Sequence, residues 1–282
     1  MPVKAVQQFM LGTVMNKEEQ AVDTMKKMKA AGYDGIELCG FMIHPSGFLV
    51  KMMTKAAGMP VGNGGKLDWP RLVGESGLKV VSIHQDLGSV EREPAKAAEE
   101  AKKFGTDKIV ITGMYRFPYG ESEAVKKLAD RLNKAGAALK AEGARLLYHN
   151  HNCEFLKNAS GKNAYQLLLA ETDASAVNFE FDSYWCAECG ENPLAVMDAL
   201  GDRMKLWHIN DRGTRQTGPC TTPILKSDSM ELGYGAMPLE ALSEKAKAVG
   251  VEAVILESHR NWIDKSPVKS FERSAAFLNA RF

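Results

Sequence analysis

Short apolar runs alternate with longer segments of helical periodicity along the whole chain. The runs are rich in β-branched and aromatic residues, and most are apolar almost throughout. This pattern is typical of parallel strands that are covered by helices. Eight such runs occupy residues 6–12, 35–40, 79–85, 108–114, 145–151, 177–185, 204–211 and 253–258.

The segments between the runs have the spacing of amphipathic helices. In "KEEQAVDTMKKMKAAG", Val22, Met25 and Met28 repeat at helical intervals, and Gly32 stands where a helix would end. Eight strands with intervening helices, in a chain of 282 residues, predict the α/β class and a single (β/α)8 TIM barrel. No linker or low-complexity stretch divides the chain, so residues 1–282 are predicted to form one domain.

Two stretches interrupt this rhythm, at residues 44–69 and 212–235. Both are long and rich in Gly, Pro, Ser and Thr. Each follows the carboxyl end of a predicted strand, which is the end where barrel enzymes build their active sites. They are therefore predicted to be lids or substrate loops, with surface decoration as the alternative.

Composition and charge exclude several classes of protein. The chain has 36 basic and 35 acidic residues and a net charge of +1, without the basic stripe of a nucleic-acid or membrane-surface binder.

The first twenty residues hold no apolar run long enough for a signal or membrane helix, which predicts a cytoplasmic protein. Five cysteines fit reduced thiols, and Cys186 and Cys189 lack the second pair that a structural zinc site needs.

Histidines and carboxylates gather where the predicted strands end. His84 ends the third run, His149 and His151 the fifth, and His208 the seventh. His44 and His259 follow the second and eighth runs. Carboxylates at the same level are Glu37, Glu154, Glu180, Asp182, Asp211 and Glu257.

A buried charged side chain is costly unless it is paired or binds a metal. Oxygen and imidazole donors together suit one divalent ion such as Mn, Co, Zn or Fe, and the histidines make Mg less favourable. Glu180 and Asp182 share one face of their strand, because side chains alternate along it. If Asp182 faces the barrel mouth, Glu180 lies one layer deeper and supports the ligands from behind. The alternatives are a buried salt bridge or a strand boundary at a different residue.

Several short motifs resemble one known superfamily over nearly the whole chain. They are "GYDGIEL" (32–38), "GLKVVSIH" (77–84), "YHNHNCEF" (148–155), "FDSYW" (181–185), "LWHINDRG" (206–213), "LGYG" (232–235) and "VILES". Their order and spacing resemble the xylose-isomerase-like TIM-barrel superfamily of sugar and sugar-phosphate isomerases and epimerases. The forms "YHNH" and "DSYW" are most similar to the branch of inosose dehydratases and enzymes of 3-keto-sugars.

The resemblance implies one metal ion at the barrel mouth. Its ligands would be a carboxylate from the fifth strand together with Asp182, His208 and Glu257. The fifth strand departs from the pattern, because His149 stands where relatives carry a glutamate. Either Glu154 reaches back from the loop, or His149 or His151 replaces the carboxylate. Glu154 is preferred because it keeps three carboxylates to balance the charge of the ion.

The resemblance also implies metal-assisted proton transfer beside a carbonyl, through an enediolate of a keto-sugar or related polyol. Return of the proton gives isomerisation or epimerisation, whereas loss of a β-oxygen substituent gives the alternative, a lyase. The acid and base candidates are His84, His149, His151 and Glu180. The substrate-binding candidates are Glu37, Trp185, Arg212 and Arg260, for which surface salt bridges or core packing are the alternatives.

Other functions of the same fold are a catalytically idle sugar-binding barrel, an apurinic endonuclease, and an enzyme of a non-sugar polyol or keto-acid. Neutral overall charge argues against the endonuclease. The expected partner is a small sugar or polyol, with neither nucleic acid nor membrane, and family habit implies a homo-oligomer, either a dimer or a tetramer.

Overall fold

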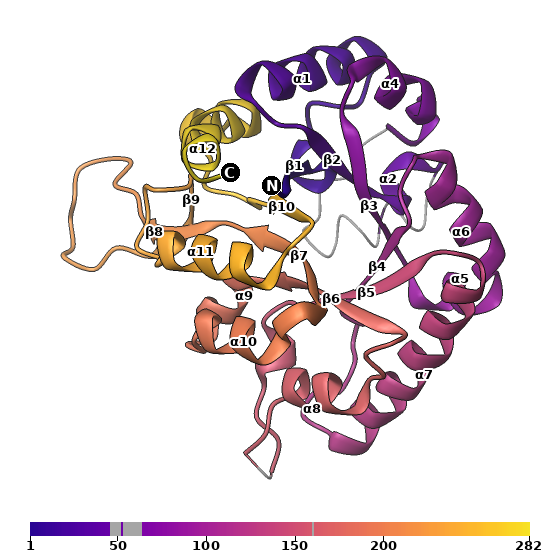
Figure 1. Ribbon diagram of the computed structural model, residues 1–282. Helices are drawn as coiled ribbons and strands as arrows, with labels where there is room; N and C mark the ends of the chain where they lie inside the picture. The colour runs from indigo at the N-terminus through magenta and orange to yellow at the C-terminus, as the bar shows by residue number, and fades with distance from the viewer. Residues whose placement is uncertain (46–51, 53–63, 160) are drawn as a thin grey trace. The chain divides into compact units, whose positions relative to one another are not determined.

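The computed structural model describes residues 1–45, 52, 64–159 and 161–282. Eight of its strands form a closed barrel in the order β1-β10-β7-β6-β5-β4-β3-β2, which confirms the predicted α/β barrel (Figure 1). These strands are β1 (Val3–Gln7), β2 (Gly35–Cys39), β3 (Lys79–Gln85), β4 (Lys108–Thr112), β5 (Arg145–His149), β6 (Val177–Asp182), β7 (Met204–Ile209) and β10 (Ala253–Leu256).

Helices follow the strands along the chain. They are α1 (Glu18–Ala31), α2 (Gly40–Ile43), α4 (Trp69–Ser76), α5 (Leu87–Arg92), α6 (Pro94–Lys103), α7 (Ser122–Ala141), α8 (Ala164–Glu171), α9 (Ser183–Glu188), α10 (Pro193–Leu200), α11 (Leu239–Val249) and α12 (Pro267–Arg281). Short 3-10 helices span Gln8–Leu11, Gly64–Lys66, Cys153–Phe155, Gly201–Arg203 and Ile263–Lys265. Among the described residues, no helix is both long and apolar enough to cross a membrane.

The chain divides into two compact units. Unit 1 comprises Met1–Lys79, Ile209–Glu244 and Val254–Phe282, and unit 2 comprises Val80–His208 and Lys245–Ala253. That residues 1–282 form a single domain stays a prediction.

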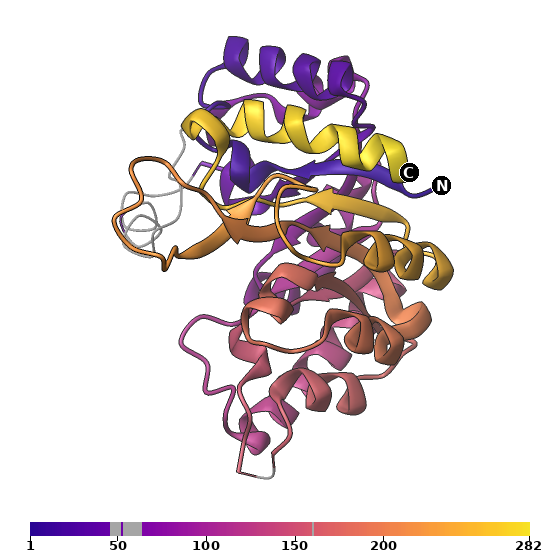
Figure 2. The same cartoon turned by 90° about the vertical axis from the view of Figure 1, so that its left-hand side faces the viewer.

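In unit 1, α1 packs against α12 and α4. Gly32 ends α1 in the left-handed conformation, at φ 98°, and its N–H donates to the carbonyl of Lys29, as in a glycine C-cap. Lys4 Nζ in β1 donates to Asn279 Oδ1 in α12 over 2.7 Å. The two ends of the chain accordingly lie close together (Figure 2).

In unit 2, β4, β5 and β6 pair in parallel, with Ile111 opposite Tyr148 and Tyr148 opposite Phe179. These three side chains are fully buried, as expected of strands covered on both faces. Helix α8 begins with a capping box, in which Asn163 accepts from the N–H of Gln166 and the Gln166 side chain accepts from the N–H of Asn163.

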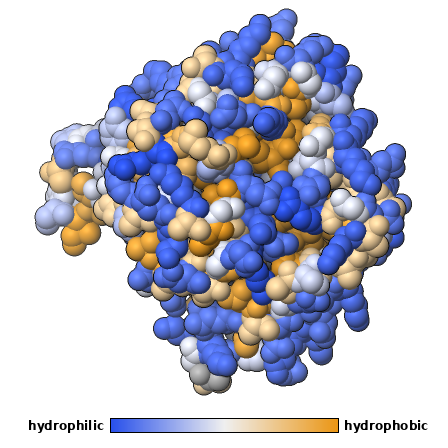
Figure 3. All heavy atoms as spheres, viewed as in Figure 1, coloured by the Kyte–Doolittle hydropathy of each residue, from blue (hydrophilic) through white to orange (hydrophobic). Residues whose placement is uncertain are grey.

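The predicted loop at 212–235 contains an antiparallel hairpin of β8 (Asp211–Thr214) and β9 (Ser227–Met230). Its tip carries Ile224, 80% exposed, and Leu225, and Figure 3 shows apolar side chains on this tip at the left. The alternating polarity that marks a hairpin is absent here, which is why the sequence indicated only a loop. Most of the other predicted loop, 44–69, lies outside the described residues.

Several predicted strands end earlier than expected. The run 177–185 was predicted as one strand, but β6 ends at Asp182, because its Oδ1 accepts from the N–H of Trp185 and caps α9. The run 6–12 likewise stops at Gln7, whose side chain accepts from the N–H of Phe9 and starts a 3-10 helix. Trp185 therefore lies in the first turn of a helix and not on a strand.

Candidate metal centre

Strand pairing in unit 2 brings polar residues side by side. His149 in β5 lies opposite Glu180 in β6, and Asp182 lies opposite His208 in β7. Glu180 and Asp182 are two residues apart and so face the same way. The fold therefore brings His149, Glu180, Asp182 and His208 together at the carboxyl ends of these strands.

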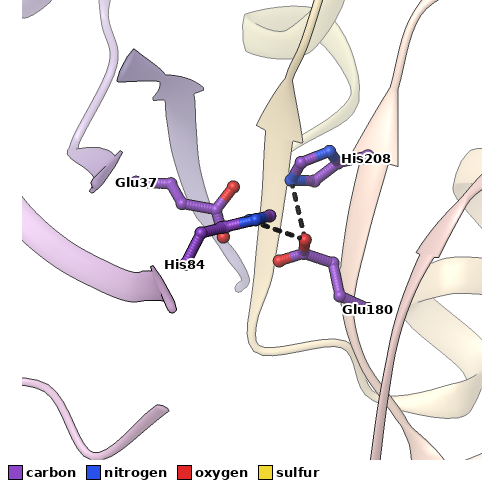
Figure 4. Close-up of side chains that lie close together, drawn as sticks. All are labelled: Glu37, His84, Glu180 and His208. Carbon is purple, nitrogen blue, oxygen red and sulfur yellow. Dashed lines mark ion pairs between the residues drawn. The ribbon is translucent and has the colours of Figure 1, made fainter. Parts of the chain in front are cut away.

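Glu180 is the centre of this cluster. Its Oε1 lies 3.1 Å from His84 Nε2, 3.0 Å from His149 Nδ1 and 3.1 Å from His208 Nε2. Figure 4 shows His84 and His208 pointing at this carboxylate from different strands. Glu180, His149 and His208 are buried, so these interactions form where water does not compete.

His149, Asp182 and His208 could together hold a metal ion. Each offers one ligand atom, and the three atoms lie within 4.8 Å of one another. His208 directs Nε2 at Glu180 and places Nδ1 3.9 Å from Asp182 Oδ2. Two imidazoles and a carboxylate form a donor set that suits a borderline divalent ion.

The backbone around Asp182 is held by Asn150, a residue that sequence reasoning missed. Asn150 Nδ2 donates to the carbonyl of Asp182 over 3.1 Å, and its Oδ1 accepts from the N–H of Asp182 over 3.0 Å. The side-chain amide of Asn150 thus takes the place of the pair of backbone hydrogen bonds that would come next between β5 and β6. Its signal was an asparagine between two histidines at a strand end, which is visible in the sequence.

Glu257, the predicted ligand from the last strand, lies in unit 1 directly after β10. Its N–H donates to the carbonyl of Ile209, the residue that follows His208 in the chain, over 3.2 Å. Its carboxylate is largely buried, and Oε2 lies 3.6 Å from His259 Nε2. A backbone hydrogen bond within unit 1 thus holds Glu257 beside Ile209.

Glu154, the ligand preferred from the sequence, is held in a different network. Its Oε1 accepts from Tyr148 Oη over 2.8 Å, and its Oε2 accepts from the N–H of His151 over 3.0 Å and from Cys153 Sγ over 3.2 Å. Burial, reinforced by the charge of Glu154, raises the pKa of Tyr148 well above its usual range, so the phenol stays a donor. The carboxylate of Glu154 therefore fixes the turn that carries His151.

His151 and Trp185 form the outer part of the cluster. Both are half-buried, and their ring centroids lie 5.9 Å apart in an edge-to-face arrangement. The ring of His151 is also 5.1 Å from that of His149. Trp207 is by contrast a core residue, because it is fully buried and donates Nε1–H to Ser183 Oγ.

The other predicted substrate residues lie in unit 1. Glu37 is fully buried and accepts from Gln7 Nε2 over 2.6 Å. Arg260 is exposed, and its Nε donates to Asp228 Oδ1 over 2.8 Å. Arg212 lies half-buried in β8, beside Asp211.

Asp211 has a structural role that its place after a strand did not reveal. Its carboxylate accepts from the backbone N–H groups of Arg212, Gly233, Gly235 and Met237. A side chain at Gly235 would overlap this carboxylate. The "LGYG" motif is therefore a turn wrapped around a buried aspartate.

Comparison with known proteins places the chain in a family. Its residues 25–281 match the model of the xylose isomerase-like TIM barrel. An inosose dehydratase from Clostridium beijerinckii is 28% identical over 137 residues, which is 49% of this chain and 40% of that protein. The aligned region thus spans less than half the length of this curated relative.

Solved structures share the fold at low sequence identity. A sugar phosphate isomerase/epimerase from Parabacteroides distasonis has a TM-score of 0.75 at 22% identity, covering 99% of this chain and 94% of that one. The IOLI protein with a bound zinc atom has a TM-score of 0.66 at 14% identity, covering 99% of each chain. Because residues 25–281, most of the chain, match the family model, the chain belongs to the xylose isomerase-like TIM barrel family.

Proposed function

We propose that this protein is a metal-dependent enzyme that isomerises or epimerises a keto-sugar or related polyol. The observation that carries the proposal is the convergence of one ligand atom each from His149, Asp182 and His208 within 4.8 Å. The zinc atom in the IOLI protein, which has the same fold, supports a divalent ion.

The ligands we propose within unit 2 are His149, Asp182 and His208, and Glu257 in unit 1 stays a ligand predicted from the sequence. His149 takes the place that the resemblance gives to a glutamate, because Glu154 already accepts three hydrogen bonds within its own turn. An ion bound there would polarise a substrate carbonyl and make the neighbouring C–H more acidic. Mn, Co, Zn and Fe suit this donor set better than Mg.

The other residues of the site then have distinct roles. His151 is the proposed acid and base, since it is half-exposed beside the ligands and a neutral imidazole can both take and give a proton. Trp185, whose ring lies edge-on to His151, is the proposed stacking surface for a sugar ring. Glu180 is proposed to act on the ligands, since its Oε1 lies 3.0 Å from His149 Nδ1 and 3.1 Å from His208 Nε2. His84 stays a predicted acid or base. Glu37, Arg212 and Arg260 stay predicted substrate contacts.

A lyase is the second candidate, because the curated relative is an inosose dehydratase. It would use the same proton abstraction and would then expel a β-oxygen substituent. The two reactions differ in their products and not in the metal ligands. A homo-oligomeric state and a cytoplasmic location stay predictions from the sequence.

The test compares the parent with Asp182→Asn and with Glu123→Gln, an exposed control on α7. Asparagine is also a good helix N-cap, so the Asp182 variant retains the start of α9. We expect about one ion per chain in the parent and control, and none in Asp182→Asn. Each protein is then incubated in deuterium oxide with ketoses, inososes and 3-keto-glycosides.

Metal-dependent deuterium uptake beside a carbonyl would support the proposal, and the product would separate isomerase from lyase. A parent that stays metal-free after Mn, Co and Zn are supplied would refute the metal site. A metal-loaded parent that exchanges no substrate proton would leave a binding protein.

A further inference from the structure

We infer that Tyr119, Tyr148 and Glu154 are positioning residues for His151. They join the loop after β4 to the turn after β5, and so hold the His151 ring at the edge of the candidate metal centre. The inference rests on the function proposed above, in which His151 is the acid and base. All four residues lie in unit 2.

A chain of hydrogen bonds runs from the loop after β4 to Glu154. The N–H of Met114 donates to Tyr119 Oη over 2.6 Å. Tyr119 Oη lies 3.0 Å from Tyr148 Oη, and Tyr148 Oη donates to Glu154 Oε1 over 2.8 Å. Glu154 Oε2 accepts from the N–H of His151 over 3.0 Å. The carboxylate thus ends a chain that begins at Met114 and also holds the backbone of His151.

The direction of these hydrogen bonds follows from the number of hydrogens. A hydroxyl has one hydrogen to donate, and Tyr148 donates its own to Glu154. Tyr119 must therefore donate to Tyr148, while it accepts from the N–H of Met114. Every donor is directed toward the carboxylate, so the hydrogen bonds polarise and strengthen one another. A change at Tyr119 is therefore expected to alter the bond between Tyr148 and Glu154.

Close packing leaves this chain little freedom. Tyr119, Tyr148 and Glu154 are all buried. Gly113 directly follows β4, and a Cβ there would overlap Glu154 Oε1 and lie 3.1 Å from Tyr119 Oη. The backbone after β4 thus lies directly against the carboxylate that holds the turn after β5. A displacement of one of these segments should therefore displace the other.

His151 lies where this chain meets the candidate metal centre. Its ring centroid lies 5.1 Å from that of His149 and 5.9 Å from that of Trp185. A misplacement of about 1 Å can slow catalysis by about 100-fold, so a residue that transfers protons depends on a firm support. We therefore expect the chain to influence turnover without changing the affinity for the metal.

The first measurement records carbon–proton spectra of the histidine rings in metal-free protein at constant pH. A His151→Gln variant identifies the His151 signals. The ring lies edge-on to Trp185, so its proton shifts report its position. Tyr119→Phe, which removes only a hydroxyl group, should shift these signals. The matched control is Tyr165→Phe, because Tyr165 is equally buried and its Oη has no hydrogen-bond partner among the described residues.

A second variant tests the same contact without removing any polar group. Gly113→Ala places a methyl group against Glu154 and should also shift the His151 signals. Its control is Gly120→Ala in the same loop, where a Cβ would meet no heavy atom within 4 Å beyond its chain neighbours in the described part of the chain. Both control variants should leave the His151 signals unchanged.

The second measurement compares turnover in the deuterium-uptake assay with the dissociation constant for Co²⁺. Tyr119→Phe should lower kcat by about 3- to 10-fold, the usual effect of one neutral hydrogen bond, with KM and Co²⁺ binding changed by less than about twofold. In Glu154→Gln an NH2 group would face either the Tyr148 hydroxyl or the His151 N–H, each of which is a donor. That variant should lower kcat by about 10- to 100-fold and still bind Co²⁺.

The outcomes separate this inference from the proposed function. Unchanged His151 signals in Tyr119→Phe would overturn the inference, and if that variant does not fold, the spectrum of Gly113→Ala decides in the same way. A kcat that falls no further in Tyr119→Phe than in Tyr165→Phe would also overturn it. Loss of Co²⁺ binding in Glu154→Gln would assign this carboxylate to the metal instead. A parent that binds no Co²⁺, but whose variants show the expected shifts, would refute the proposed function and leave the support of His151 standing.

Discussion

Gly136 and Gly74 both lie in helices, but an added methyl group would meet different surroundings at the two positions. At Gly136, inside α7, a Cβ would overlap the carbonyl oxygen of Ala176 and lie 2.9 Å from the carbonyl carbon. At Gly74, exposed on α4, it would meet no heavy atom within 4 Å beyond its own helix and chain neighbours in the described part of the chain. Comparing glycine-to-alanine substitutions at the two positions therefore tests the contact between α7 and the carbonyl group of Ala176.

The magnitudes follow from two opposing effects. Replacing a helical glycine by alanine favours the folded state by about 0.5–1 kcal/mol, and Gly74→Ala should show this gain. At Gly136 the neighbour is backbone and cannot rotate away, so overpacking at the upper end of about 1–3 kcal/mol should exceed the gain. Gly136→Ala should therefore lose about 1–2 kcal/mol, which places the two variants about 2–3 kcal/mol apart.

Urea unfolding measured by circular dichroism provides the assay. The urea concentration at the midpoint of unfolding should rise for Gly74→Ala and fall for Gly136→Ala. The dependence of the unfolding free energy on urea concentration should be unchanged in both variants. A Gly136→Ala variant as stable as the parent would show that α7 does not press on the carbonyl of Ala176. That result would refute the packing of α7 against the chain before β6.

Three further outcomes are expected. Burial alone would raise the pKa of Asp107 and Glu252, but Arg145 and Lys108 hold both pKa values below their usual range. These carboxylates therefore stabilise the fold above about pH 4 and lose that contribution as the pH falls. Arg145→Met should lower the free energy of unfolding by about 1–2 kcal/mol at neutral pH, after allowance for solvent screening. Urea unfolding measures this loss, and a loss that did not shrink below about pH 4 would contradict the prediction. Asn163→Ala should lower the stability by about 1 kcal/mol through loss of the α8 cap, seen as a lower urea midpoint. A chelator should lower the melting temperature of metal-loaded parent but not of Asp182→Asn, because an ion bound only to the folded state stabilises it.

The repeated pattern of the chain predicted the fold, which the structure confirms, and the place of a candidate site, which stays a prediction. Parallel strands covered by helices leave a strong local signature, and β2, for example, is buried along all five residues. Because all carboxyl ends of such strands meet at one end of a barrel, the histidines at the run ends could be assigned to one cluster. The prediction that Glu180 lies behind Asp182 followed from alternation alone.

Element boundaries were less predictable. "VNFEFDSYW" is apolar and aromatic enough to continue as a strand, and only the hydrogen bond from the Trp185 N–H to Asp182 shows where the helix takes over. The hairpin of β8 and β9 was missed because its strands are short and polar, so that pairing between them and not composition defines it.

The sequence by itself determined the barrel, its helical cover and the set of polar residues at its strand ends, because these depend on periodicity and chain order. Only the tertiary structure decided which of these polar residues lie together in the candidate metal centre and which make other contacts. His149 and Glu154 lie five positions apart near one strand end, yet His149 points at Glu180 whereas Glu154 accepts from Tyr148 and His151. The direction of His149 depends on a carboxylate from another strand, and that of Glu154 on the path of its own turn. Spacing along the chain carries no information about the directions in which side chains meet.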